Sequence, residues 1–213
     1  MPPVNTAPRT AHARHSAATR ERIVVAAGEL MTRDGYARTS IAAIARGADV
    51  AVQTVYNAVG SKRDVLEAVL DRAASGPDAP RSVPEFMAER ADAATTAVGM
   101  VEVLADWFAQ SQPRVAAVMR LIREAAAVDE GVAELERERA SRRLHNYGMA
   151  ADQLAGKPGA VAMERDAAAA IIWSIGHPQT YGHLVEVEGW DVARYRDWVA
   201  TTLRAALTSH AER

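Results

Sequence analysis

Residues 39–70 read TSIAAIARGADVAVQTVYNAVGSKRDVLEAVL. Two short segments with apolar residues at helical spacing are separated by Gly47-Ala48-Asp49-Val50, and a further helix is expected to begin after Ser61. Short paired helices with a tight turn can place one helix in the major groove while the other braces it against the phosphates. The stretch therefore predicts a helix-turn-helix reader whose partner is double-stranded DNA.

The residues around the turn predict where each helix begins and ends. Apolar residues recur at helical spacing over 17–33, and Asp34-Gly35 is expected to end that helix. Thr39 is the predicted N-cap of the second helix, which ends near Gly47. A third helix is expected over 51–57. Ser61 and Asp64 have the spacing of a capping pair for a fourth helix.

The composition favours an all-α fold. Of the 213 residues, 49% are hydrophobic, and no alternating run of Val, Ile and Thr indicates a strand. The chain has 0 cysteines, which excludes disulfides, thiolate metal sites and a cysteine nucleophile. The N-terminal stretch has no apolar core typical of a signal or membrane anchor, so we expect a cytoplasmic protein, nucleoid-associated when bound to DNA, with no membrane partner.

Charge is distributed unevenly along the chain. The formal net charge is -2, yet residues 1–72 hold ten Lys and Arg against seven Asp and Glu, whereas residues 73–213 hold fifteen against twenty. The basic part is the one with the helix-turn-helix pattern. This modest excess is consistent with nucleic-acid binding but would not establish it alone.

Three regions are predicted. Residues 1–16 read as a disordered basic arm, which either reaches a minor groove through Arg9 and Arg14, with His12 and His15, or is simply solvated. Residues 17–74 form the DNA-binding domain. A proline-rich break over 75–84 separates it from a helical effector-binding and dimerisation domain at 84–213, with helices near 92–111, 114–128, 131–154, 163–175, 178–187 and 191–209.

The third helix carries the candidate base-reading side chains. Gln53 can pair bidentately with adenine, and Thr54 can contact a thymine methyl group or a phosphate. Tyr56 and Lys62 are of types that position a protein on the DNA backbone. Val55 and Tyr56 are placed to dock on the first two helices, whereas Val52 and Asn57 lie outside that face.

The first ~70 residues resemble the DNA-binding domain of the tetracycline-repressor (TetR) family of bacterial transcription regulators. The likeness rests on Gly35-Tyr36, Thr39-Ser40-Ile41, Ile44-Ala45, Thr54-Val55-Tyr56 and Ser61-Lys62. It implies that Thr39 and Ser40 touch phosphate, that Gln53, Thr54 and Tyr56 lie in the groove, and that Lys62 clamps the backbone. Asp49 and Ala51 depart from the family pattern, which commonly has a turn glycine and a capping serine there.

The C-terminal segment is similar to that of many family members, which implies a helical ligand domain whose last two long helices form a two-fold dimer interface. The final helix carries a large apolar stripe that fits a dimer or the chain's own core equally well. The expected interface residues are Ile172, Tyr195, Trp198, Val199 and Leu203. The expected lining of a small-molecule pocket is Met100, Trp107, Phe108, Met119, Tyr147 and Trp173, each of which could instead be ordinary core.

The resemblance predicts a ligand-responsive regulator that binds a palindromic operator as a homodimer, with repression as the family's habit and no cofactor. Two other classes of protein remain open. An enzyme is disfavoured because no phosphate loop, nucleophile elbow or zinc-protease motif occurs, and His183 and Glu186, with His177, make a weak metal site. A helical adaptor that binds only protein would bind no DNA in a salt-dependent manner.

Overall fold

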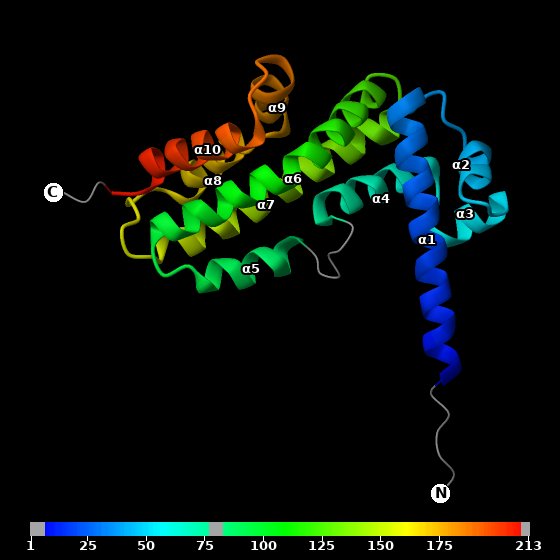
Figure 1. Ribbon diagram of the computed structural model, residues 1–213, viewed down its shortest axis with the longest axis horizontal. Coiled ribbons are helices and arrows are strands. Elements are labelled where there is room, and N and C mark those ends of the chain that lie inside the picture. Colours follow the sequence, from blue (N-terminus) through cyan, green and yellow to red (C-terminus); the bar gives the residue numbers. More distant parts are fainter. Residues whose placement is uncertain (1–6, 77–82, 210–213) are drawn as a thin grey trace, which may run out of the picture. The chain divides into compact units, whose positions relative to one another are not determined.

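The computed structural model describes residues 7–76 and 83–209, and it confirms the all-α fold (Figure 1). Within these residues the only β-type pairing is an isolated bridge between Ala160 and Thr208. No described helix combines the length and apolarity needed to cross a membrane. The elements are α1 (Ala7–Asp34), α2 (Ile41–Gly47), α3 (Val52–Ala58), α4 (Lys62–Ser75), α5 (Val83–Ala93), α6 (Ala97–Ala126), α7 (Glu130–Ala155), α8 (Arg165–Ile175), α9 (Pro178–Tyr181), the π-helical turn η1 (Gly182–Val187) and α10 (Val192–Leu207).

The chain divides into two compact units. The first contains Met1–Arg72 together with Arg120–Leu135, and the second contains Ala73–Met119 and Glu136–Arg213. The end of α6 and the start of α7 thus belong to the same unit as α1, α2 and α3. The domain boundaries proposed from sequence did not include this contribution, because nothing local in residues 120–135 indicates a partner so far away in the chain.

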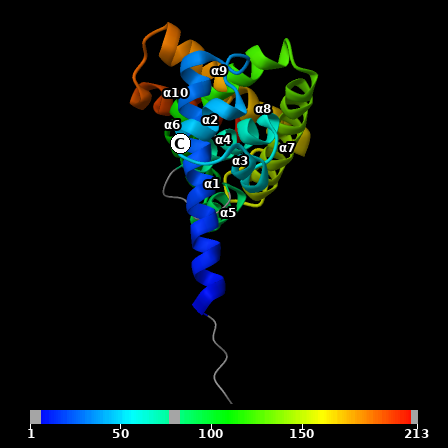
Figure 2. The same ribbon diagram turned by 90° about the vertical axis from the view of Figure 1, so that its right-hand side faces the viewer.

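In the first unit, α2 and α3 pack against α1 (Figures 1 and 2). Fully buried apolar side chains from different helices form this core, which places the short α2 and α3 on a longer support. The largest fully buried side chains of this unit are Ile23 and Met31 of α1, Ile44 of α2, Leu66 of α4, Ile122 of α6 and Leu135 of α7. Val55 is the buried residue of α3.

The turn between α2 and α3 has the conformation that its sequence predicts. Asp49 has a φ of 53°, in the left-handed region that Asp tolerates better than most residues. The N–H of Val50 donates to the carbonyl of Ala45 at 3.0 Å, which closes the end of α2. The turn therefore forms without a glycine at position 49.

The helix caps confirm one prediction and correct another. Ser61 and Asp64 form a capping pair, in which the Ser61 N–H and hydroxyl both donate to Asp64 Oδ2 at 2.8 Å. Ser40, rather than Thr39, caps α2, and its Oγ accepts the Ala43 N–H at 3.1 Å. Thr39 is 2% exposed and donates its hydroxyl to the Gly35 carbonyl, so the predicted N-cap was one residue too early.

Several helices differ from their predicted bounds, and α5 (Val83–Ala93) lies almost wholly where no helix was predicted. α1 begins at Ala7 rather than Ala17, so residues 7–16 are helical and not part of a disordered arm. Ala is the best helix former, and Pro8 lies in the first turn, where a missing N–H is tolerated. Residues 1–6 lie outside the described residues.

α6 continues through Pro113, where the sequence analysis expected a break between two helices. Pro113 itself is exposed, so water can satisfy the carbonyl that its ring leaves without a donor. Phe108 before it and Val115 after it are buried, and this packing outweighs the local cost of the proline.

The second unit has its own core, which corrects the predicted dimer interface. Ile172, Tyr195, Val199 and Leu203 are each 0% exposed within the single chain. They pack in one cluster with Met100, Leu104 and Phe108 of α6, and Trp198 packs partly against it. Side chains that their own chain covers completely have no surface to offer a partner, so the stripe on α10 is intramolecular core.

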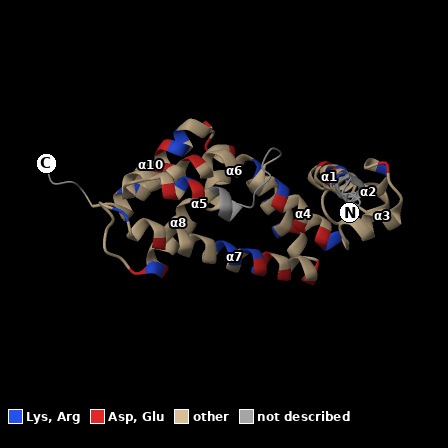
Figure 3. Cartoon of the chain, turned by 90° about the horizontal axis from the view of Figure 1, so that it is seen from below, with Lys and Arg blue, Asp and Glu red and all other residues tan. Residues whose placement is uncertain are grey.

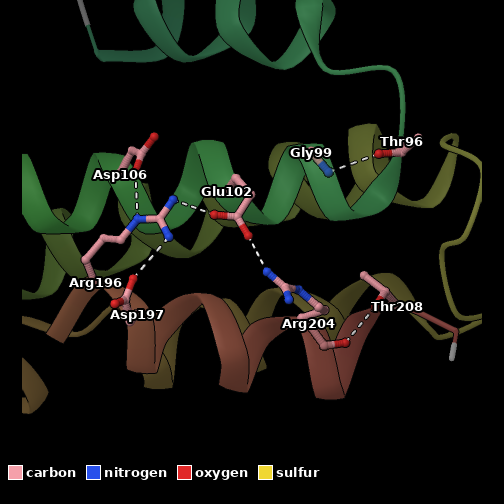
Figure 4. Close-up of polar contacts among 8 residues, drawn as sticks. All are labelled: Thr96, Gly99, Glu102, Asp106, Arg196, Asp197, Arg204 and Thr208. Atoms are coloured by element: carbon pink, nitrogen blue, oxygen red, sulfur yellow. Dashed lines mark hydrogen bonds and ion pairs between the residues drawn. The ribbon is translucent and has the colours of Figure 1, made fainter. Parts of the chain in front are cut away.

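Ion pairs join α10 to α6 in this unit (Figure 4). Arg196 Nε donates to Asp106 at 2.9 Å, and Glu102 accepts from both Arg196 and Arg204. The side chains of Arg196 and Glu102 are 28% and 31% exposed, so water screens this pair only in part. Together these contacts fix the register of α10 against α6 above the apolar cluster.

Replacing Glu102 with Gln is expected to lower the free energy of unfolding by about 1 kcal/mol, because one carboxylate serves two arginines there. Urea denaturation would measure the change, which should shrink in high salt. Asp197→Asn is the control, since Asp197 is 75% exposed and meets Arg196 only at 3.4 Å. Equal effects of the two variants would contradict a special role for Glu102.

Ala51→Ser is expected to stabilise the chain by about 1 kcal/mol. Ala51 is the N-cap of α3 and provides no side-chain hydrogen bond, whereas a serine hydroxyl there would accept an N–H of the first turn. Ala42→Ser, at an exposed position inside α2, is the control and should be mildly destabilising. Thermal unfolding would measure both, and a lower melting temperature for Ala51→Ser would contradict the expectation.

Candidate nucleic-acid interface

α3 exposes most of its side chains. Val52 and Tyr56 are 44% and 49% exposed, Gln53 and Asn57 are also exposed, and Thr54 is half-buried. Tyr56 therefore does not dock into the core, which corrects that prediction, whereas Val55 does. An exposed, mixed polar and apolar helix face has the donors, acceptors and apolar contacts that base edges in a major groove require.

Gln53 and Asn57 act on each other along this face. Gln53 Nε2 donates to Asn57 Oδ1 at 3.0 Å. This bond uses one donor of Gln53 and the acceptor of Asn57, so Gln53 Oε1 and the Asn57 amide N–H groups remain available to a ligand. Bidentate recognition of adenine requires one donor and one acceptor. Gln53 and Asn57 each have both, and they lie one helical turn apart.

Lys62 lies over the ring of Tyr36, with Nζ 4.1 Å from the ring centroid. The Tyr36 hydroxyl donates to Asp129 Oδ2 at 3.2 Å. Burial, and then Asp129, raises the pKa of Tyr36 to about 12, so the phenol keeps its proton. Burial lowers the pKa of Lys62, an effect that Asp129 opposes. The predicted phosphate clamp is therefore half-buried and held by contacts within its unit.

Asp129 is a residue that sequence reasoning missed. It is 93 residues from Tyr36 in the chain, and no local pattern marks the pair. A second bond of the same kind runs from Arg63 Nε to the Gly131 carbonyl at 3.0 Å. These bonds attach the start of α7 to the loop after α1 and to the start of α4.

Charge at this surface comes from residues beside α3. The helix itself has no Lys, Arg, Asp or Glu (Figure 3). Arg46, at the end of α2, is exposed and lines an open hollow of about 420 Å³ with Ala45, Asp49, Val50 and Ala51. Arg46 was not singled out from the sequence, although an exposed arginine next to the turn suits a phosphate contact.

The side chains predicted to line a ligand pocket all belong to the second unit, where they are core or lie at its edge. Met100, Phe108 and Met119 are buried, and Trp107 and Tyr147 pack against the core cluster. Phe108 and Tyr147 meet edge-to-face, with ring centroids 5.9 Å apart. Trp173 is half-buried, with its Nε1 covered and without a hydrogen-bond partner.

His183 and Glu186, with His177, are the one weak metal candidate in the sequence. His183 lies 3.8 Å from Glu188 rather than beside a set of ligands. Across residues 7–76 and 83–209, no group of three or more His, Asp or Glu side chains is placed to hold a metal ion.

Known structures share this fold over nearly the whole chain. NalD, the secondary repressor of the MexAB-OprM multidrug efflux pump in Pseudomonas aeruginosa, has a TM-score of 0.72 and 18% identity, covering 93% of this chain and 100% of its own. A putative TetR-family transcriptional regulator from Mesorhizobium loti has a TM-score of 0.68 and 18% identity, covering 91% and 98%. FadR from Bacillus subtilis, in complex with stearoyl-CoA, has a TM-score of 0.65 and 18% identity, covering 86% and 96%.

No curated protein matches the chain by sequence. Residues 23–69, however, match the family of bacterial regulatory proteins called tetR. That segment runs from the middle of α1 to α4 and so includes the turn, α3 and the caps described above. This match identifies residues 23–69 as a helix-turn-helix DNA-binding domain of the tetR family of bacterial regulatory proteins, and the chain as a whole shares the fold of the structures above.

Proposed function

We propose that this regulator is a repressor that binds a palindromic operator as a homodimer and leaves it when a small molecule binds its C-terminal helices. The observation that supports operator reading most directly is the face of α3. Val55 is buried, while Gln53, Tyr56 and Asn57 are exposed on a helix without charge. Such a helix reads base edges, and the surrounding cations supply affinity.

Within this proposal the contacts have different tasks. Gln53 and Asn57 discriminate bases, and Thr54 and Val52 contact thymine methyl groups or the adjacent backbone. Ser40, Tyr56 and Lys62 hold phosphates. Thr39 has no such role in the proposal, because its hydroxyl is buried and already donates to Gly35.

Gln53→Ala is expected to change which operator bases are preferred, with a loss of about 1–3 kcal/mol of discrimination at one position of each half-site. Lys62→Ala should weaken binding to all sequences and reduce the salt slope by about 1. Binding selection on randomised DNA and salt titration measure the two effects. Gln179→Ala, an exposed glutamine on α9, is the control. Unchanged base preference in Gln53→Ala would refute the assignment.

A helical adaptor is the competing reading. Operator binding predicts that the logarithm of affinity falls with the logarithm of salt concentration, by about 0.9 for each phosphate neutralised. An adaptor that binds only protein would bind no promoter fragment in this manner. No enzyme activity is part of the proposal.

The homodimer has to use surface that the single chain leaves open. Figure 1 draws α8 beside α10, and the two helices contact each other. On α8, Ala167, Ala170 and Ser174 are exposed and uncharged, and Ile171 is half-buried between them. We place the two-fold contact on this face, where small side chains let two helices approach closely. Two recognition helices about 34–36 Å apart would then read the two halves of a palindrome.

Ala170→Arg is expected to give a monomer, because it puts two charges against each other across a two-fold axis. Light scattering measures the mass, and operator binding should weaken at least tenfold, by about 1.4 kcal/mol. Ala155→Arg, at the exposed end of α7, is the control and should leave the mass unchanged. An unchanged dimer mass in Ala170→Arg would place the interface elsewhere.

A further inference from the structure

Arg143 lies in α7, and no carboxylate among the described residues accepts a hydrogen bond from it, although Glu136, seven residues earlier, attracts it through space. Its Nη1 donates to the sulfur of Met119 at 3.1 Å, and its Nε is covered from solvent and has no hydrogen-bond partner. The side chain is only partly accessible. A guanidinium has five N–H donors, and a thioether sulfur is among the weakest acceptors in proteins.

This environment is unfavourable for a cation. Burial lowers the pKa of Arg143, Tyr147 and Glu136 act in the opposite direction, and the neighbouring Arg139 lowers it further. Desolvated charges in proteins are normally paired and hydrogen-bonded, because leaving one unpaired is strongly destabilising. Glu136 attracts Arg143 but accepts no hydrogen bond from it, so the guanidinium would gain from a counter-ion that comes from outside the chain.

Tyr147, which also acts on Arg143, lies among aromatic rings and a further donor without a partner. Tyr147 follows one turn later on α7 and packs edge-to-face on Phe108. Burial raises the pKa of Tyr147 to about 12, so it stays a neutral phenol. Tyr195 carries a buried hydroxyl without a partner, and its pKa is raised by burial and by Tyr147. The site thus combines aromatic rings with donors that have no acceptor.

We infer that Arg143 binds the carboxylate of a small organic acid whose apolar body lies against Phe108 and Tyr147, with Met119 moving aside. The inference rests on the proposed ligand-responsive function and names its effector class. A carboxylate presents two coplanar acceptors that match the guanidinium fork. Met119 holds that place in the free protein, and its flexible, unbranched side chain can repack at low cost.

The competing ligand classes fit less well. A cationic ligand would be repelled by Arg143 and Arg139, which lie on the same helix. A wholly apolar ligand would cover the guanidinium further without satisfying it, which costs free energy. An acid with an apolar body matches both parts of the site.

The test compares acids with their uncharged amides on the full chain by titration calorimetry. Octanoate and phenylbutyrate should each bind at least about tenfold more tightly than octanamide and phenylbutanamide, as a charge-assisted bidentate pair requires. Arg143→Gln should abolish this preference. Arg142→Gln removes the same charge from an exposed neighbour and should retain it. Equal binding of acid and amide, or a preference that survives Arg143→Gln, would overturn the inference.

A second measurement needs no ligand. Arg143→Met replaces the unpaired charge with an apolar side chain of similar length, so its melting temperature should equal or exceed that of the unchanged chain. A clear fall would mean that Arg143 has a partner within the protein and would refute the assignment.

Operator binding is measured separately, so the two ideas fail in different ways. Acid preference without any operator binding would refute the repressor but keep the site. Salt-dependent operator binding without acid preference would refute the site alone.

Discussion

The DNA-reading surface proposed for α3 depends on the packing of one side chain, Val55, into the core of its unit. α3 has seven residues, too few for a helix to persist in water by its own hydrogen bonds. It persists because Val55 is covered completely by the helices around it, and because the left-handed Asp49 sets the angle at which the chain enters it. Val55 is the one buried side chain of α3, so Val52, Gln53, Tyr56 and Asn57 remain exposed.

The N-terminal region could be predicted from the sequence because its structure is determined by residues that lie close together in the chain. The turn at Asp49 and the Ser61–Asp64 capping pair each involve residues within a few positions of one another. The buried face of α1 likewise follows from the spacing of Ile23, Ala27 and Met31. The error in the cap of α2 was a single residue, whereas the start of α1 was placed ten residues too late. Ser40 and Thr39 both have the chemistry of an N-cap, and only the geometry of the chain decides that Thr39 turns inward.

The second unit was less readable because its determinants are not local. An apolar stripe on α10 has the same pattern whether it faces a second copy or α6, and the buried Tyr195 and Leu203 settle the matter only once the fold is known. Pro113 reads as a helix end, yet the packing of Phe108 and Val115 carries α6 past it. The first unit also has a determinant of this kind, because the bond between Tyr36 and Asp129 joins positions that no short motif could connect.

A ligand releases DNA only if it binds two states of the protein with different affinity. α7 is one helix from Glu130 to Ala155, and Arg143 lies within it. Just before its start, Asp129 accepts the hydroxyl of Tyr36, and in its first turn the Gly131 carbonyl accepts Arg63. A covalent path therefore leads from the proposed acid site to bonds beside Lys62. A carboxylate ligand would pair with Arg143, which has no hydrogen-bonded carboxylate in the free protein. The ligand therefore stabilises the conformation in which it can reach Arg143 more than any other conformation. DNA release then requires that α7, and with it Asp129, has a different position in this conformation from its position in the DNA-binding conformation.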